Sequence, residues 1–161
     1  GKTTLARSVT QSLRMPAHWV AGAESARSVP LGIFASLLGS PMSGDPVAML
    51  ADAFETVRRE HFSVIGVDDI HLVDPLSATL LHQLAVEGSV RIVATARTAE
   101  PIPDTITALW KDGYLTRLDV GPFDKTESVE LIESALAGRL ERLSADLVWE
   151  ASGGNALFML T

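Results

Sequence analysis

The sequence contains no cysteine, and aromatic residues make up only 6% of its 161 residues. Without cysteine, the chain can form neither disulfide bonds nor thiolate metal sites. No segment reaches the roughly 18 uninterrupted apolar residues of a membrane-spanning helix, and no secretory signal pattern stands at its start. We therefore expect a cytoplasmic protein that does not associate with a membrane.

Basic residues are also scarce. Lysine and arginine number 13 against 20 aspartates and glutamates, which gives a net charge of −7. They are scattered along the chain, and only Arg58 and Arg59 are adjacent. Since binding to nucleic acid requires a row of cations along the phosphates, we do not expect this segment to bind DNA by itself.

Four short β-branched runs alternate with helical patterns, at residues 18–22, 62–69, 90–97 and 114–121. Such alternation is typical of a parallel sheet with crossover helices. The runs at 62–69 and 90–97 are apolar nearly throughout, as expected of central strands that are covered on both faces. The sequence therefore predicts an α/β fold.

Three helices carry start signals in which an aspartate caps the first turn. These starts are Asp45 with Pro46, Asp74 with Pro75, and Asp124 with Glu127; the expected stops are Gly88 and Gly138. A Gly, Pro, Ser and Asp cluster at 39–46 predicts a loop. After the run at 114–121 we find only helical patterns, at about 124–137, 144–152 and from 155 onward. We expect an α/β core over residues 1–122 and a small helical part over 123–161.

The first four residues, "GKTT", match the end of the phosphate-binding pattern G-x-x-x-x-G-K-[ST]. In that pattern backbone N–H groups converge on phosphate oxygens at a helix N-terminus. We expect Gly1, Lys2, Thr3 and Thr4 to bind the phosphates, with the Lys2 charge on the β- and γ-phosphates and the Thr3 hydroxyl on Mg²⁺.

On this interpretation the first strand and most of the loop are missing, so that the chain is a fragment that begins inside the motif. The helix that follows would turn Leu5, Val9 and Leu13 toward the sheet. The alternative for four residues alone is an ordinary turn ahead of an amphipathic helix.

A second motif, "FSVIGVDDIH", is an apolar strand that ends in two carboxylates. Asp68 would hold the metal ion, and Asp69 could orient or deprotonate the attacking water. The alternative for both residues is the strand-end and turn chemistry that is common for aspartate.

The next strand ends with Thr95, Arg97 and Thr98, where a polar or cationic group can sense the γ-phosphate. Arg97 could stabilise the charge that develops during transfer, although a surface arginine is the alternative. The sequence favours His71 as a structural group near the strand end over a ligand or base.

With "GKTTLA", "VIGVDDIH", "VRIVATART" and "WEASGGNALFML" in this order, the chain resembles the signal-transduction ATPases of the AAA-like STAND group. Within that group it is most similar to the ATPase modules of bacterial LuxR-family transcriptional regulators, which carry a segment like "SARSVPLGIFASLLG" after their second strand. The resemblance covers nearly the whole chain. It implies a three-layer P-loop NTPase fold, here without its first strand, followed by a helical lid.

The resemblance also implies a nucleotide switch, in which ATP or ADP with Mg²⁺ sits between sheet and lid. Its state would be coupled to homo-oligomerisation and to DNA binding through a C-terminal helix-turn-helix that is absent from this chain. Lys2 and Thr3 would bind phosphate and Mg²⁺, and Asp68 would be the acidic ligand. Asp69 would be the catalytic carboxylate and Arg97 the first sensor.

The "GGNAL" stretch is similar to a Gly-Asn-Pro-Leu motif of the lid, which implies that Gly154 and Asn155 contact the nucleotide. Ala156 stands where the motif has its proline, so the contact with the adenine loses that group. We expect slow ATP hydrolysis in the intact protein. The competing functions are a nucleotide-binding scaffold without hydrolysis and a P-loop kinase for small molecules.

Overall fold

The computed structural model describes residues 1–39 and 44–159. The chain divides into two compact units. We call Thr3–Arg117 the sheet unit, and we call Leu118–Thr161 together with Gly1–Lys2 the helical unit. In the described part of the chain, no helix is both long enough and apolar enough to span a bilayer.

The sheet unit contains a three-stranded parallel sheet in the order β1-β2-β3. The strands are β1 (Ala17–Ala21), β2 (Val64–Asp68) and β3 (Arg91–Ala94). Residues 64–67 of the central strand are all buried, as its continuous apolar pattern predicted. The register pairs Val64 with both Ala17 and Arg91, so the carboxyl ends of the three strands lie at the same edge. The α/β class and three of the four predicted strands are thus confirmed. The prediction that the run at 90–97 is a central strand covered on both faces is wrong, because β3 lies at the edge of the sheet and its residues are exposed or half-buried.

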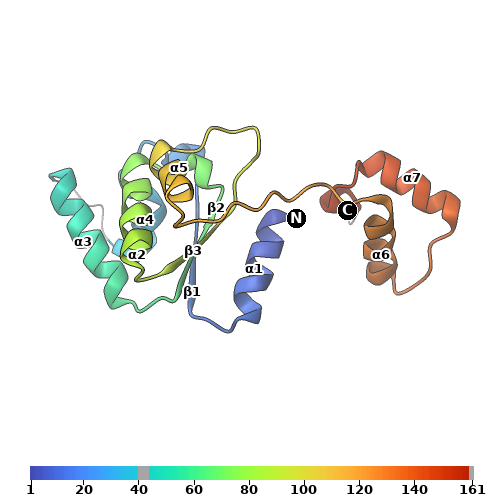
Figure 1. The fold of residues 1–161 in the computed structure, drawn as a ribbon, viewed down its shortest axis with the longest axis horizontal. Helices are drawn as coiled ribbons and strands as arrows, with labels where there is room; N and C mark the ends of the chain where they lie inside the picture. The colour runs from blue at the N-terminus through green and yellow to red at the C-terminus, as the bar shows by residue number, and fades with distance from the viewer. Residues whose placement is uncertain (40–43, 160–161) are drawn as a thin grey trace. The chain divides into compact units, whose positions relative to one another are not determined.

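Helices lie on both sides of this sheet (Figure 1). They are α1 (Lys2–Ser12), α2 (Ala35–Leu38), α3 (Pro46–Arg59), α4 (Pro75–Glu87) and α5 (Asp104–Lys111), with 3-10 turns η1 (Glu24–Ala26), η2 (Gly32–Phe34) and η3 (Ile70–Leu72). Strand β2 and helix α4 both contribute to the core, with Ile65, Val67, Leu80, Leu81 and Leu84 fully buried. The caps predicted at Asp45 and Asp74 are present, and Gly88 ends α4 in the left-handed conformation. The loop expected at 39–46 includes residues 40–43, which lie outside the described residues.

Helix α1 lies on the opposite side of the sheet from α4 (Figure 1). Its Arg7 guanidinium lies 5.0 Å from the centre of the Trp19 ring, and that ring covers Gly66 of β2. A side chain at position 66 would overlap the indole. Gly66 therefore leaves room for the large residue that separates α1 from the sheet.

The prediction that Leu5, Val9 and Leu13 face the sheet is wrong. These side chains are 52%, 47% and 59% exposed, whereas Thr10 is buried. The rotation of α1 is set by Thr3, whose hydroxyl bonds to Asp68 of β2. Positions two apart on a helix point in nearly opposite directions, so fixing Thr3 inward turns Leu5 outward.

The sequence pattern predicts that Val47, Leu50, Phe54 and Val57 form the inward face of α3, and this is only partly correct. Val57 is buried and Leu50 and Phe54 are partly buried against the core, but Val47 is 74% exposed. The other buried residues of α3 are Met49 and Ala53. The pattern also predicts Leu76, Leu80, Leu81 and Leu84 as the buried stripe of α4. The last three are buried and Leu76 is partly buried.

The fourth predicted strand, at 114–121, is absent from the described structure. The N–H groups of Tyr114 and Leu115 donate instead to the Leu109 carbonyl and close the last turn of α5. Leu118 is 82% exposed. A strand needs backbone partners on a neighbour, and the ladder of β3 runs along β2 alone.

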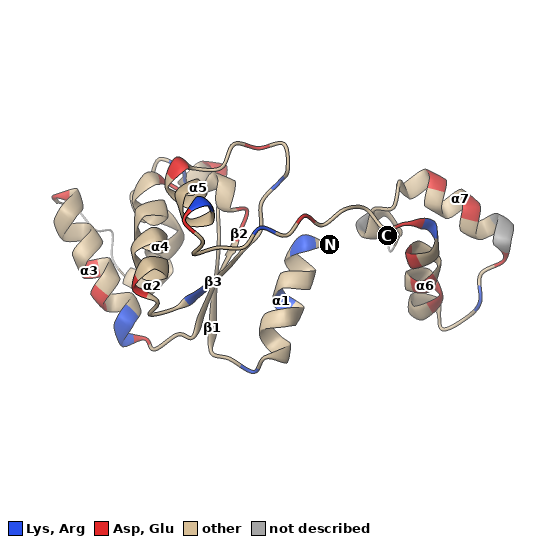
Figure 2. Cartoon of the chain, in the orientation of Figure 1, with Lys and Arg blue, Asp and Glu red and all other residues tan. Residues whose placement is uncertain are grey.

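The helical unit contains α6 (Lys125–Leu136), α7 (Arg142–Ser152) and α8 (Ala156–Met159). The capping box of Asp124 and Glu127 is present. Acidic residues lie on both α6 and α7 (Figure 2). The expected stop at Gly138 is one residue late, because Ala137 takes the left-handed conformation and its N–H donates to Glu133. The sequence pattern predicts that Leu131, Ile132, Ala135 and Leu136 form the inward face of α6. Ile132 is buried, but Ala135 is exposed and Leu136 is 67% exposed.

Candidate functional site

Polar side chains from three segments meet at the carboxyl edge of the sheet. The Thr3 hydroxyl, in the first turn of α1, donates a hydrogen bond of 2.8 Å to Oδ1 of Asp68 at the end of β2. The hydroxyl of Thr95, which follows β3, donates to the same oxygen. The structure therefore brings together Thr3 and Asp68, the two residues that the sequence predicts as magnesium ligands.

This pair fits a magnesium ion. Magnesium binds oxygen ligands at about 2.0–2.1 Å in octahedral geometry, which places neighbouring ligands about 2.9 Å apart. The oxygens of Thr3 and Asp68 are 2.8 Å apart. To coordinate the ion, the Thr3 hydroxyl would turn its proton away from Asp68. No group of three or more His, Cys, Asp or Glu side chains within the described ranges could hold a metal, so the other ligands would be water and phosphate oxygens.

Thr95 is a residue whose role the sequence did not resolve. The sequence suggested only that a polar group here could sense phosphate, but the side chain is 7% exposed and points inward. Its Oγ1 donates to Asp68 and accepts a 3.1 Å hydrogen bond from the Asp69 N–H. One buried hydroxyl thus holds the carboxylate of Asp68 and the backbone of Asp69. The sequence signal that could have indicated this role is a threonine directly after an apolar strand.

Asp69 stands in the left-handed region, with φ of 49°. Gly22 packs against the backbone of this residue, and a Cβ at position 22 would overlap the Asp69 carbonyl oxygen. The Gly22 N–H donates a 2.8 Å hydrogen bond to the Asp68 carbonyl. The Asp69 carboxylate is 34% exposed. Its Oδ1 lies 3.7 Å from Nε of Arg97 and 3.9 Å from Nδ1 of His71.

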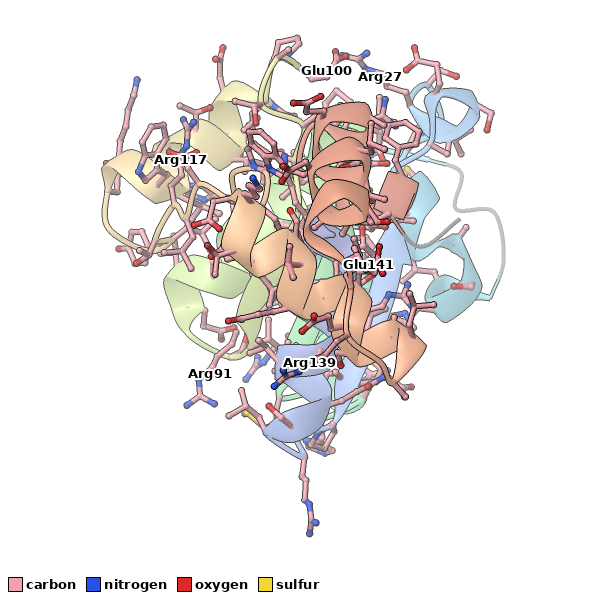
Figure 3. The ribbon with its side chains drawn as sticks, turned by 90° about the vertical axis from the view of Figure 1, so that its right-hand side faces the viewer. Arg27, Arg91, Glu100, Arg117, Arg139 and Glu141 are labelled. Carbon is pink, nitrogen blue, oxygen red and sulfur yellow. The ribbon has the colours of Figure 1, made fainter. Side chains whose placement is uncertain are left out.

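Arg97 is near Asp69 but is not fixed by it. Its side chain is 67% exposed, and an exposed ion pair at this distance contributes little to stability. Arg97 borders an open depression of about 290 Å³ whose lining residues are Glu24, Arg27, His71, Leu72, Arg97, Glu100 and Pro101. Arg27 and Glu100 lie at one end of the view and Arg91 at the other (Figure 3), which agrees with the position of Arg91 at the start of β3.

Asp74 has a structural role beyond the helix cap that the sequence predicts. Its buried carboxylate accepts hydrogen bonds from the N–H groups of Leu31, Gly32, Leu76 and Ser77 and from the Ser77 hydroxyl. Leu31 is itself in the left-handed conformation. One side chain therefore caps α4 and holds the turn at 31–32, some 42 residues earlier in the chain.

The remaining predicted phosphate ligands lie at the start of the chain. Gly1 and Lys2 group with the helical unit, and Thr3 groups with the sheet unit. Lys2 opens α1 and Thr4 is exposed in its first turn. Of the four predicted phosphate ligands, Thr3 is therefore the one that the structure places against Asp68 in the sheet unit.

Gly154 and Asn155 belong to the helical unit, where the structure gives both a local role. The Gly154 carbonyl accepts a 2.8 Å hydrogen bond from Phe123, and Gly154 has φ of 75°. A Cβ there would overlap the Phe123 carbonyl. The Asn155 carbonyl accepts from the N–H groups of Phe158 and Met159 in α8.

Comparison with known proteins adds no identification. No protein-family model matches the chain, and no curated protein matches it significantly.

Proposed function

We propose that the chain is a magnesium-dependent module that binds a nucleoside triphosphate. The observation that carries the proposal is the contact between Thr3 and Asp68, which are 65 residues apart in sequence and 2.8 Å apart at their oxygens. A hydroxyl in the first turn of a helix, beside an acidic group at the end of a buried strand, is the arrangement that holds Mg²⁺ against β- and γ-phosphates. Lys2, next to Thr3, would supply the positive charge.

ATP is the nucleotide that we propose, on the resemblance to STAND ATPases. In the longest natural polypeptide that contains this sequence, ATP and ADP would favour different conformations. That change would be coupled to homo-oligomerisation and to DNA binding by a helix-turn-helix, as in LuxR-family regulators. Thr3 and Asp68 would hold the magnesium ion, which would supply positive charge against the phosphates.

For hydrolysis, we assign Asp69 to the attacking water and Arg97 to the transferred phosphoryl group. Asp69 follows the metal ligand Asp68 directly, and its carboxylate is partly exposed, so water can reach it. It would accept a hydrogen bond, and then a proton, from that water. Arg97, which is 3.7 Å from Asp69, would offset negative charge on the phosphoryl oxygens.

One observation favours the alternative of a scaffold that binds nucleotide without hydrolysing it. The Asp69 carboxylate lies beyond hydrogen-bond distance from both Arg97 and His71. Turnover by an Asp69→Asn variant separates the two functions: an unchanged rate would remove Asp69 from the chemistry.

The first experiment is a titration with fluorescently labelled ATP, with and without Mg²⁺. It would be done on this chain and on the longest natural polypeptide that contains it, each as wild type, Lys2→Ala and Arg91→Ala. Arg91→Ala removes a cation at the opposite end of β3 and is the matched control. Binding that requires Mg²⁺, is lost in Lys2→Ala and survives in Arg91→Ala supports the proposal. Equal binding by the wild type and both variants would overturn it.

A further inference from the structure

His71 has a buried ring nitrogen without a hydrogen-bond partner among the described residues. The residue lies in η3, two positions after Asp69, and 3% of its side chain is exposed. Its Nδ1 atom has no hydrogen-bond partner in the described structure. Buried polar atoms are rarely left unpaired, so this one requires an explanation.

The group that faces this nitrogen is the Asp69 carboxylate. Oδ1 of Asp69 lies 3.9 Å from Nδ1 of His71. That distance exceeds a normal N–H···O hydrogen bond by about 1 Å. Closing this gap requires the Asp69 side chain to rotate, and that side chain is 34% exposed.

The backbone on both sides of Asp69 is already held in place. The Asp69 N–H donates to Thr95 Oγ1 over 3.1 Å, and the Ile70 N–H donates to the Thr95 carbonyl over 2.9 Å. The Leu72 N–H donates to the Asp69 carbonyl over 2.9 Å. With the backbone held, the orientation of the Asp69 carboxylate depends only on the side-chain torsion angles of Asp69.

Two neighbours can set them, and they differ in rigidity. Arg97 lies 3.7 Å from the same Oδ1 atom, but its side chain is 67% exposed. The imidazole of His71 is enclosed by the fold and has few conformations available. A fixed donor defines the direction of a carboxylate better than a mobile one does.

We propose that His71 is a positioning residue for Asp69. Its Nδ1–H donates a hydrogen bond to Oδ1 of Asp69 and holds the carboxylate in one orientation toward the attacking water. The proposal rests on the function proposed above, in which Asp69 acts on that water. It assigns His71 a role that its sequence pattern does not indicate.

The first test is the tautomer of His71, measured by ¹⁵N NMR of the imidazole at a pH where the ring is neutral. It is measured in the free protein and with ATP and Mg²⁺ added. We expect the Nδ1–H tautomer and a changed Nδ1 shift in Asp69→Ala, with no change in His82→Leu, which alters a histidine of α4. The Nε2–H tautomer, with Nδ1 bare, would overturn the proposal. Because the tautomer can be measured without turnover, it tests the His71–Asp69 hydrogen bond even in a protein that does not bind nucleotide. Failure to bind nucleotide would overturn the proposed function but not this hydrogen bond.

The second test is single-turnover hydrolysis by His71→Leu and His71→Asn. Leucine removes the donor, whereas the asparagine amide nitrogen can occupy nearly the position of Nδ1. We expect His71→Leu to slow hydrolysis about 10- to 100-fold, as for other residues that orient a reacting group, without changing the affinity for ATP. His71→Asn should recover most of the rate. Equal rates in wild type, His71→Leu and His71→Asn would refute the positioning role.

Discussion

The hydroxyl of Thr3 and the carboxylate of Asp68 are 2.8 Å apart, although 65 residues separate them in the chain. The contact joins the first turn of α1 to the carboxyl end of the central strand. It has two consequences. It fixes the rotation of α1 about its axis, which leaves Leu5 and Val9 exposed, and it places two oxygen atoms at the spacing of neighbouring magnesium ligands.

We predict that Thr3→Ala lowers the apparent affinity for Mg²⁺ in the presence of ATP by about tenfold or more, since one ligand is lost. Thr3→Ser keeps the hydroxyl and should stay close to wild type. Thr79→Ala removes a threonine hydroxyl that bonds only within α4 and serves as the control. Magnesium titrations of ATP binding would check this, and a Thr3→Ala protein with wild-type magnesium affinity would contradict it.

Thr95→Val should destabilise the sheet unit by about 1–3 kcal/mol, because valine has the same shape but leaves the Asp69 N–H without its acceptor. The matched control is Thr56→Val, since the Thr56 hydroxyl bonds to the Asp52 carbonyl on the exposed surface of α3. Urea unfolding of both variants measures the difference. Equal losses would mean that the buried hydroxyl of Thr95 contributes nothing beyond a surface hydroxyl.

The sequence predicted the central part of the sheet unit well. The run that became β2 is apolar and buried over residues 64–67, and the Asp45 and Asp74 caps mark helix starts. Such signals are local and therefore readable in a single sequence. The strand expected at 114–121 failed because strand formation also depends on a neighbouring strand, which no local pattern reports.

The candidate site was also predicted only in part, because local patterns show where a strand ends but not how its side chains pack. Asp68 and Asp69 stand at a recognisable strand end, so their position followed from the pattern. The inward direction of Thr95 and the burial of His71 did not, because both depend on how β3 and η3 pack against β2. The five hydrogen bonds to Asp74 likewise include two from a turn that is remote in sequence.

Gly66→Ala should cost about 1–3 kcal/mol, since overpacking of a filled region forces neighbours to move. A Cβ at this position overlaps the Trp19 ring, and the Arg7 guanidinium lies 5.0 Å from the centre of the same ring. Gly121→Ala is the control, because a Cβ there meets nothing within 4 Å. Thermal unfolding monitored by tryptophan fluorescence would detect the change. A Gly66→Ala protein as stable as Gly121→Ala would show that the indole can move aside freely.

The carboxylate of Asp74 should be the most important single polar group for the stability of the sheet unit. Asp74→Ala removes the cap of α4 and also leaves the buried N–H of Leu31 without its acceptor, whereas the Gly32 N–H keeps its hydrogen bond to the Val29 carbonyl. We expect a loss of about 3 kcal/mol, because the desolvation penalty of the unpaired Leu31 donor adds to the lost cap.

Asp45→Ala separates the two contributions. Asp45 also caps a helix with proline in its first turn, but its side chain accepts one exposed hydrogen bond, from Ala48 over 3.3 Å. Loss of that cap alone should cost about 1 kcal/mol. Urea unfolding should therefore place Asp74→Ala well below Asp45→Ala in free energy of unfolding. If the two losses were equal, the bonds from Asp74 to the turn at 31–32 would contribute nothing, and α4 and that turn would be held together by apolar packing alone.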